Sequence, residues 1–241
     1  MSHATNMPMH SPTTFFEVRV ARENFKFNAA HFVAFKGFRE RLHGHNYQVG
    51  VRLLGSRHIC SDGYVLDFGD VKKVIRAVCK KLNEYFICPT LSNVLDIKIE
   101  KDEDGNETNV KITCEDGTKF SFPRGDCAML PIVHVTAEEL AIYIWGEILR
   151  DFDRNRLLGR GIHTMEVRVT EAPGQEAVFG LPIPSPDDEQ GTQKAFDVAG
   201  FITGHNLPAS PCPSAPGSRD IVNNNKLGKE PEACGKCESN H

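Results

Sequence analysis

The sequence contains no long apolar run, no basic block and no leader-like N-terminus, and each absence excludes a class of protein. No segment approaches the ~18 consecutive apolar residues that a membrane-spanning helix requires. The formal net charge of -4 is spread along the chain, so no basic block offers a surface to nucleic acid or to a membrane. Residues 1–14 have neither the basic nor the apolar region of a targeting signal, so we expect a cytoplasmic protein.

The cysteines lack the spacing of a small disulfide-bonded domain. Eight of them are scattered along the chain, which is typical of free thiols in a reducing compartment. Cys234 and Cys237 form one Cys-x-x-Cys pair, but no second pair lies at finger spacing, so the pair is only half of a zinc ribbon. With 241 residues, the chain can bury one substantial core and carry tails.

Alternation of apolar and polar residues predicts several short strands. Successive side chains of a strand point to opposite faces, so alternation indicates one buried face. The predicted strands are residues 15–22, a segment ending at His31, and residues 45–54, 63–68, 164–170 and 176–180.

Two segments have the three-and-four spacing of amphipathic helices. The first runs from residue 71 to about residue 86, with Lys and Arg between its apolar positions. The second starts at Thr136-Ala137-Glu138-Glu139 and reaches about residue 151. This start is a capping box, in which the Thr136 oxygen and the Glu139 carboxylate satisfy free amides of the first turn. We therefore expect two helices, each with one face on a sheet.

Between the two helices, three alternating segments are separated by turn signals at Asp104-Gly105 and Asp116-Gly117. They predict a small antiparallel meander inserted over residues 93–130. After residue 181 the composition changes to Pro, Ser, Asp, Gly and Asn, with few apolar residues to bury. We therefore expect one domain over residues 15–181 and disordered tails over residues 1–14 and 182–241.

The stretch Leu42-His43-Gly44-His45-Asn46-Tyr47, taken with His31, is the strongest chemical motif. His43 and His45 are two residues apart on a predicted strand, so both side chains project to the same side. A hairpin that joins this strand to the one ending at His31 brings three imidazoles together. Three histidines with an open fourth position are the ligand set of a catalytic zinc ion. The alternative is a group of half-buried strand histidines bonded to backbone carbonyls.

These motifs and their order resemble the 6-pyruvoyl-tetrahydropterin synthase and 6-carboxytetrahydropterin synthase family over about residues 15–180. The segments that carry the resemblance are Ala30-His31, His43-Gly44-His45-Asn46-Tyr47, Gly63-Tyr64-Val65-Leu66-Asp67-Phe68, Thr136-Ala137-Glu138, Tyr143-Ile144-Trp145 and Val169-Thr170-Glu171. The resemblance implies an α+β tunnelling fold (T-fold), a four-stranded antiparallel sheet with two helices on one face, here with the inserted meander. It also implies a homo-oligomer, a hexamer built as a dimer of trimers.

The resemblance implies roles for five residues. His31, His43 and His45 are the expected Zn²⁺ ligands. Glu171 is expected to anchor the pterin, because a carboxylate accepts hydrogen bonds from the paired 2-amino and ring N–H groups. Thr136 is placed where the family contacts the pterin from the start of the helix, and its alternative role is only that of a helix cap.

The chain departs from the family at the residues that move protons. Members that make 6-pyruvoyl-tetrahydropterin use a cysteine upstream of the His-Gly-His element and an Asp-His pair after the first helix. No cysteine lies between His31 and His43, and the chain reads Asn83-Glu84 near the position of the Asp-His pair. Glu40 is the acid–base group left in the loop. A similar subset of the family has glutamate in place of this cysteine and converts 7,8-dihydroneopterin triphosphate to 6-hydroxymethyl-7,8-dihydropterin for folate synthesis.

The resemblance thus implies a zinc-dependent lyase in which Glu40 carries the proton. Lys36, Arg39 and Arg41 are candidate contacts for the triphosphate, or else solvated charges, and Glu40 is alternatively a surface carboxylate paired with one of the arginines. Two other functions stay open. One is 6-pyruvoyl-tetrahydropterin or 6-carboxytetrahydropterin synthase activity, and the other is that of a non-catalytic pterin- or zinc-binding homologue.

Overall fold

The computed structural model describes residues 15–56, 59–185 and 196–205. The expected N-terminal tail, most of the expected C-terminal tail, and the Cys234 and Cys237 pair lie outside these residues. In the described part of the chain, no helix is long and apolar enough to cross a membrane.

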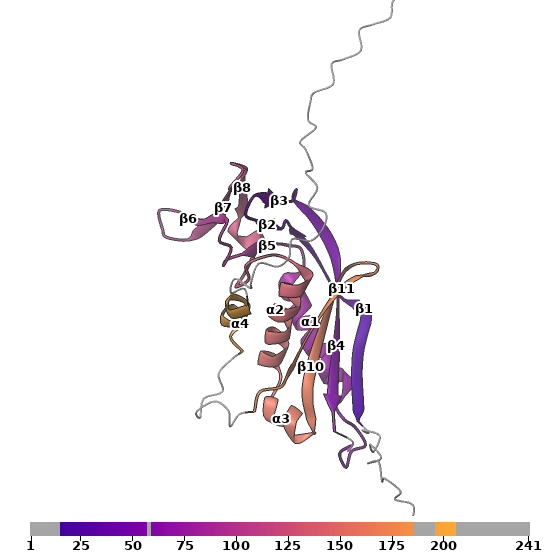
Figure 1. Ribbon diagram of the computed structural model, residues 1–241. Coiled ribbons are helices and arrows are strands. Elements are labelled where there is room, and N and C mark those ends of the chain that lie inside the picture. The colour runs from indigo at the N-terminus through magenta and orange to yellow at the C-terminus, as the bar shows by residue number, and fades with distance from the viewer. Residues whose placement is uncertain (1–14, 57–58, 186–195, 206–241) are drawn as a thin grey trace, which may run out of the picture. The chain divides into compact units, whose positions relative to one another are not determined.

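The main element of the described domain is a six-stranded sheet in the order β11-β10-β4-β1-β5-β9 (Figure 1). Four strands pair antiparallel: β1 (Phe16–His31), β4 (His43–Gly55), β10 (Ile162–Ala172) and β11 (Gln175–Pro182). Two short strands, β5 (Tyr85–Pro89) and β9 (Cys127–Leu130), extend the sheet with parallel pairing. The predicted four-stranded antiparallel sheet is confirmed, and the parallel extension is additional to it.

The strand that ends at His31 is longer than predicted. Residues 15–22 and the segment ending at His31 are not two strands separated by a turn. They form one strand, β1, whose pairing with β4 shifts register between Ala21 and Lys26. A β-bulge keeps both halves in one sheet while it bends the strand. The register then sets His31 opposite His43, as the predicted hairpin requires.

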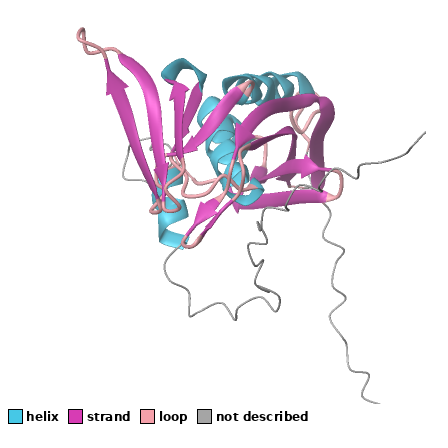
Figure 2. Cartoon of the chain, turned by 90° about the horizontal axis from the view of Figure 1, so that it is seen from above, coloured by secondary structure: helices cyan, strands magenta, loops and turns pink. Residues whose placement is uncertain are grey.

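Helices α1 (Phe68–Leu82) and α2 (Ala137–Asp151) pack on the same face of the sheet, as predicted (Figures 1 and 2). Their apolar side chains and the inward residues of the strands form one core, which includes Phe27, Tyr47 and Trp145. A short helix, α3 (Arg154–Gly159), follows α2 and leads into β10.

The limits of α1 differ from those predicted. Residues 63–68 form turns and the helix start instead of a strand, and Asp67 Oδ1 accepts a hydrogen bond from the Gly69 N–H (2.7 Å). The helix ends at Leu82 because the next residue, Asn83, has an extended backbone (φ -74°, ψ 129°) and Glu84 has a left-handed one (φ 66°). The chain then enters β5, so the predicted last turn of the helix is part of the sheet.

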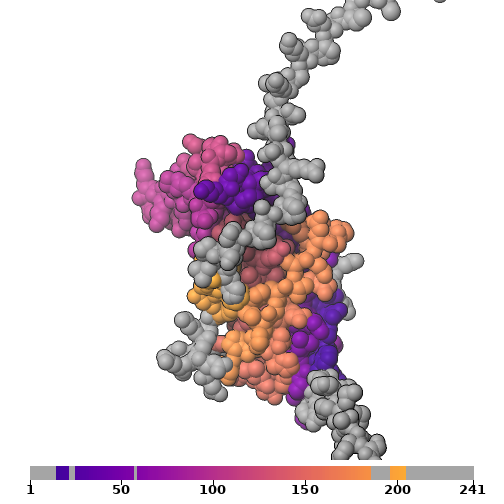
Figure 3. Space-filling model, viewed as in Figure 1, coloured from indigo at the N-terminus to yellow at the C-terminus, as the bar shows by residue number. Residues whose placement is uncertain are grey.

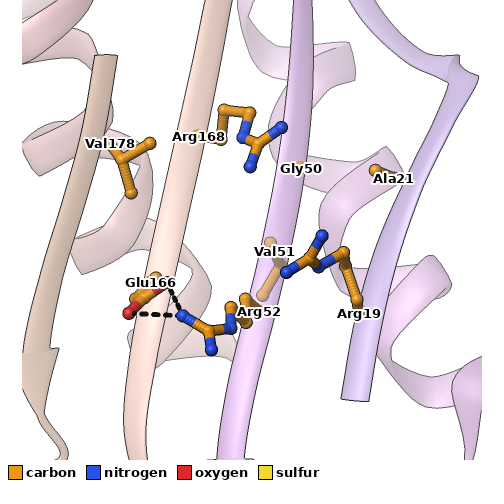
Figure 4. A pocket seen from close by; sticks show the side chains of 8 residues that line it. All are labelled: Arg19, Ala21, Gly50, Val51, Arg52, Glu166, Arg168 and Val178. Carbon is orange, nitrogen blue, oxygen red and sulfur yellow. Dashed lines mark hydrogen bonds and ion pairs between the residues drawn. The ribbon is translucent and has the colours of Figure 1, made fainter. Parts of the chain in front are cut away.

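The sheet face opposite the helices carries charged side chains. Arg52 on β4 donates to Glu166 on β10 (2.9 Å) and forms an ion pair with Glu17 on β1 (2.9 Å). Figure 4 shows Arg19, Arg52 and Arg168 on this face, around a hollow of about 30 Å³. An antiparallel sheet that is covered on one side typically has one apolar and one polar face. The strands were predicted from the alternation of apolar and polar residues that such a sheet produces.

The predicted meander is confirmed as a separate three-stranded antiparallel sheet of β6 (Leu95–Lys101), β7 (Glu107–Cys114) and β8 (Lys119–Pro123). Phe120 on β8 stacks on Phe32, next to His31, with 5.0 Å between ring centroids. A small hairpin of β2 (Ala34–Phe35) and β3 (Phe38–Arg39) lies beside the meander (Figure 1). After β8, a 3-10 turn, η1 (Arg124–Asp126), leads into β9, so the end of the expected insertion belongs to the main sheet.

Part of the expected C-terminal tail packs on the domain as helix α4 (Val198–His205). The ring of Phe196 lies 4.7 Å from that of Trp145 on α2, and Phe201 lies 5.3 Å from Phe179 on β11. In Figure 3, the yellow atoms of α4 lie beside the orange surface of the later strands. The expectation of disorder is wrong for this segment, because its aromatic side chains have apolar partners far away in the sequence.

Gly146 on α2 gives α4 the space in which it docks. A Cβ atom at this position lies 2.7 Å from Val198 Cγ2 and 3.1 Å from Phe196 Cδ1. Gly146→Ala is therefore expected to displace α4, although alanine ordinarily favours a helix by up to ~1 kcal/mol over glycine. Amide hydrogen exchange of residues 198–205 should become faster. Gly159→Ala is the control, because its added Cβ meets nothing within 4 Å, and equal protection of α4 in both variants would contradict the prediction.

Candidate active site

Three histidines converge where the ends of β1 and β4 pair. The ring centroid of His31 lies 4.6 Å from that of His43 and 5.2 Å from that of His45. One ligand nitrogen from each ring lies within 4.8 Å of the other two. Two nitrogens bound to one ion at about 2.0–2.1 Å lie roughly 3.3 Å apart, so small side-chain rotations complete a ligand set. The structure thus brings the three predicted ligands together.

Backbone carbonyls orient two of these rings. His31 Nδ1 lies 3.0 Å from the Val135 carbonyl oxygen, and His43 Nδ1 lies 2.7 Å from the Arg41 carbonyl oxygen. A carbonyl only accepts hydrogen bonds, so each Nδ1 carries a proton, and in the neutral tautomer this leaves the lone pair on Nε2. Burial lowers the pKa of His31 and so favours its neutral form. The sequence also allowed histidines that are only hydrogen-bonded to backbone carbonyls, and these hydrogen bonds are present. They do not exclude a metal, because they orient the Nε2 atoms that a metal requires.

The segment that holds His31 is itself fixed by the start of α2. Thr136 Oγ1 accepts a hydrogen bond from the Glu139 N–H (3.3 Å), as the capping box predicts. The Glu139 carboxylate, however, accepts from the N–H groups of Val133 (2.7 Å) and His134 (3.0 Å), which precede the helix. This carboxylate therefore fixes the residues just before Val135, whose carbonyl orients His31.

Glu171 and Tyr47 complete this cluster. Glu171 Oε1 accepts a hydrogen bond from the Tyr47 hydroxyl (2.9 Å) and lies 3.3 Å from Nε2 of both His31 and His45. Burial and the negative charge of Glu171 raise the pKa of Tyr47, so its hydroxyl stays a neutral donor. No role was predicted for Tyr47. The signal was its position two residues after His45, which sets both side chains on the same face of the strand.

The histidines open into a cavity of about 580 Å³ that Glu40, Thr136 and Glu171 also line. Glu40 follows β3, and its Oε2 accepts a hydrogen bond from the Val33 N–H (3.0 Å). Thr136 caps α2 and also lines the cavity. Its role as a helix cap is therefore compatible with a contact to a ligand in the cavity. All the residues singled out as ligands, proton carrier and pterin contacts therefore lie around one cavity.

Asn83 and Glu84, which replace the Asp-His pair of the resemblance, do not line this cavity. Asn83 Oδ1 accepts from the Asn28 N–H (2.9 Å), and the Glu84 N–H donates to the Asn28 carbonyl (2.6 Å). Glu84 lines a second cavity of about 490 Å³, together with Asp126. His45 lines both cavities. In the described chain, the Asn-Glu pair is thus separated from the three-histidine cavity.

A family model described as 6-pyruvoyl tetrahydropterin synthase matches residues 19–181, a span that includes every residue of the three-histidine cavity. The chain belongs to the 6-pyruvoyl tetrahydropterin synthase family. It is accordingly a lyase-type pterin enzyme, and its three-histidine cluster is a possible metal site that fits the metal dependence of the family.

Two solved 6-pyruvoyl tetrahydropterin synthases confirm the tunnelling fold. The Plasmodium vivax protein is 45% identical with a TM-score of 0.65, covering 70% of this chain and 99% of that one. The Plasmodium falciparum protein is 42% identical with a TM-score of 0.66 and the same coverage, 70% and 99%. The P. vivax protein is also solved with a glutamate, described as a catalytic residue, replaced by alanine or cysteine. A Methanocaldococcus jannaschii protein, to which 6-carboxy-5,6,7,8-tetrahydropterin synthase activity is ascribed, is 31% identical over 173 residues, covering 68% of this chain and 94% of that protein.

The cavity of this 6-pyruvoyl tetrahydropterin synthase family member has an acidic lining. Its charged lining side chains, apart from histidine, are Glu40, Glu138, Glu171 and Glu176, with no lysine or arginine among them. Arg39, a candidate triphosphate contact, instead donates to Asp116 (2.8 Å). In the described chain Arg39 therefore pairs with the meander and does not line the three-histidine cavity.

Proposed function

We propose that the chain is a zinc-dependent lyase that cleaves the side chain of 7,8-dihydroneopterin triphosphate to give 6-hydroxymethyl-7,8-dihydropterin for folate synthesis. The observation that carries this proposal is Glu40 on the wall of the three-histidine cavity, in a loop that has no cysteine. A glutamate described as catalytic in the P. vivax relative supports the same choice.

Zinc is the proposed ion because three neutral imidazoles with an open fourth position suit its tetrahedral geometry. His31 and His43 are oriented for this by their Nδ1 contacts with backbone carbonyls. When bound, zinc lowers the pKa of a coordinated substrate hydroxyl toward neutrality.

Glu40 is the proton carrier of the proposed reaction. The carboxylate accepts the proton of the C2′ hydroxyl, the C1′–C2′ bond breaks, and its electron pair moves into the reduced pterin ring. C2′ leaves as an aldehyde that keeps the triphosphate. Glu40 then returns the proton to C1′, which becomes the hydroxymethyl carbon, so the step needs no oxidant or reductant. The Val33 N–H holds one oxygen of this carboxylate in position (3.0 Å).

Glu171 and Thr136 are the proposed pterin contacts. Glu171 lies at the end of β10 and accepts from Tyr47, which fixes the carboxylate at the edge of the histidine cluster. Its charge suits the 2-amino and ring N–H donors of a pterin. Thr136 lines the cavity from the start of α2, so it lies within reach of the same ligand.

Two other functions have an observation in their favour. The name of the M. jannaschii relative favours 6-carboxytetrahydropterin synthase activity, with 6-pyruvoyl-tetrahydropterin synthase activity as its close variant. The presence of Asn83 and Glu84 in place of the Asp-His pair favours a non-catalytic pterin- or zinc-binding homologue.

Mass spectrometry of the products formed from dihydroneopterin triphosphate by the purified, zinc-loaded protein separates these functions. The proposal expects a 6-hydroxymethyl product in stoichiometric amounts with the two-carbon aldehyde triphosphate. A pyruvoyl or carboxy product would establish the first alternative. Substrate binding without turnover would establish the second.

We also propose that the chain assembles as a hexamer, a dimer of trimers. Its sheet ends in two edge strands, β9 and β11, and unpaired edges are ordinarily covered by another element or another copy. Light scattering at micromolar concentration should give six times the chain mass of 26.8 kDa. A monomer under these conditions would contradict the assembly without affecting the assignment of the cavity.

A further inference from the structure

The loop that carries Glu40 is held in place by hydrogen bonds to the N–H, the carbonyl and the carboxylate of this residue. The Glu40 N–H donates to the Val33 carbonyl (2.9 Å), and Glu40 Oε2 accepts from the Val33 N–H (3.0 Å). The Glu40 carbonyl accepts from Arg39 Nη1 (2.8 Å). Two of these hydrogen bonds are made with Val33, and the third depends on the Arg39 side chain.

Arg39 joins this loop to the turn between β7 and β8 of the meander. Its Nε donates to Asp116 Oδ2 (2.8 Å) and its Nη2 donates to Thr118 Oγ1 (3.1 Å). The guanidinium carbon lies 5.7 Å from the centre of the Phe120 ring. A planar guanidinium holds several acceptors in one fixed arrangement, which a lysine cannot do. The side chain is only 19% exposed, so water competes less for these bonds than at an open surface.

The turn that receives Arg39 is itself well defined. Asp116 Oδ1 accepts from the Thr118 N–H (2.9 Å), and the Cys114 N–H donates to the Thr118 carbonyl (2.9 Å). The Thr118 N–H and the Arg39 guanidinium lower the pKa of Asp116, so this carboxylate stays ionised. A second link to the loop comes from Glu115, whose Oε2 accepts from the Gly37 N–H (3.0 Å).

We propose that the inserted meander positions the Glu40 loop and that Arg39 is the positioning residue through which it acts. The proposal rests on the proposed role of Glu40. Residues of the meander do not line the three-histidine cavity, so the meander reaches the proposed proton carrier through the loop. Figure 1 shows β3 beside β8, with the meander at the end of the domain where these contacts form.

The test compares kinetics with loop exchange in the zinc-loaded, full-length protein. Arg39→Ala is expected to lower kcat by roughly 10- to 100-fold, the scale of a misplaced catalytic group, with zinc content and KM unchanged. Amide hydrogen exchange at Gly37 and Glu40 should become faster. Arg39→Lys, which keeps the charge without the planar donor set, should restore only part of kcat.

Coupling to Glu40 separates positioning from general loss of stability. In a Glu40→Gln background, Arg39→Ala should reduce kcat no further, because there is no carboxylate left to position. Arg124→Ala is the matched control. It removes an arginine–carboxylate pair with Glu107 (2.7 Å) at the other end of β7 and should leave both kcat and loop exchange unchanged.

Each outcome decides one of the two proposals. Arg39→Ala with native kcat and native exchange would overturn the positioning role, as would an equal loss of kcat with and without the Glu40 carboxylate. If the native protein does not turn over dihydroneopterin triphosphate, the proposed function fails. Loop exchange then still tests the contact, since exchange that Arg39→Ala leaves unchanged would overturn positioning, and faster exchange would support it.

Discussion

Replacing His43 by alanine is expected to abolish both metal binding and turnover. The three-histidine cluster offers one nitrogen per residue, so the variant retains two ligands, too few to hold zinc at ordinary free-metal concentrations. Zinc content measured after dialysis against a weak chelator should fall from about one ion per chain to background. Turnover of dihydroneopterin triphosphate should fall with it, because the substrate hydroxyl loses the ion that acidifies it.

His163→Ala is the matched control for this loss. His163 is exposed on β10, where its Nδ1 lies 2.9 Å from Thr164 Oγ1, and it does not line the cavity. The variant should keep full zinc content and native kcat. Circular dichroism of His43→Ala should match that of the native protein, which would show that the variant keeps its sheet. Full zinc occupancy in a folded His43→Ala protein would contradict the proposed ligand set.

The histidine cluster was predictable because its geometry is local. The two-residue period of a strand alone sets His43 and His45 on one face, and a single antiparallel pairing adds His31. Periodicity and turn residues likewise predicted β4, β10, β11, the two long helices and the meander. These features depend on neighbours within a few residues, which a sequence displays directly.

The end of α1 and the strand β5 were not predictable from such patterns. Tyr85–Pro89 has no alternation, because Phe86, Ile87 and Cys88 are all buried, and an apolar run after a helix is easily taken for its last turn. The change from helix to strand takes place at Glu84, which has a left-handed backbone. The Glu84 N–H donates a hydrogen bond to the carbonyl of Asn28, which is 56 residues away in the sequence. Contacts of that separation override local periodicity.

The same reason explains α4 and the Glu40 loop. Phe196 and Phe201 belong to a short apolar run, residues 195–203, inside a tail that is polar on average, and they pack against Trp145 and Phe179 in the space left by Gly146. The sequence left Arg39 as a triphosphate contact or a solvated charge, and it did not reveal the partner Asp116, which is 77 residues away in the sequence. Composition describes a segment by itself, whereas docking depends on the surface it meets.

Glu40→Gln is expected to keep zinc and pterin binding and to lower kcat by ~10²–10⁴-fold, the typical effect of removing a general acid–base group. Glutamine keeps the shape of the side chain and an oxygen that can accept from the Val33 N–H, so the loop should stay in place. Glu138→Gln is the comparison, because it removes another carboxylate of the same cavity. Its kcat should fall by less than about 10-fold if position, rather than total negative charge, determines the effect.

Glu40→Cys tests whether this one residue selects the product. A thiol at this position resembles the cysteine of family members that make 6-pyruvoyl-tetrahydropterin, so product analysis should show part of the turnover shifted toward that compound. If the Asp-His pair is also required, Asn83 and Glu84 prevent the change of product. Replacing them by Asp and His in the Glu40→Cys variant should then give the 6-pyruvoyl compound. Native turnover by zinc-loaded Glu40→Gln would instead make Glu40 a surface charge. Glu84, at the second cavity beside His45, would then be the carboxylate to replace next.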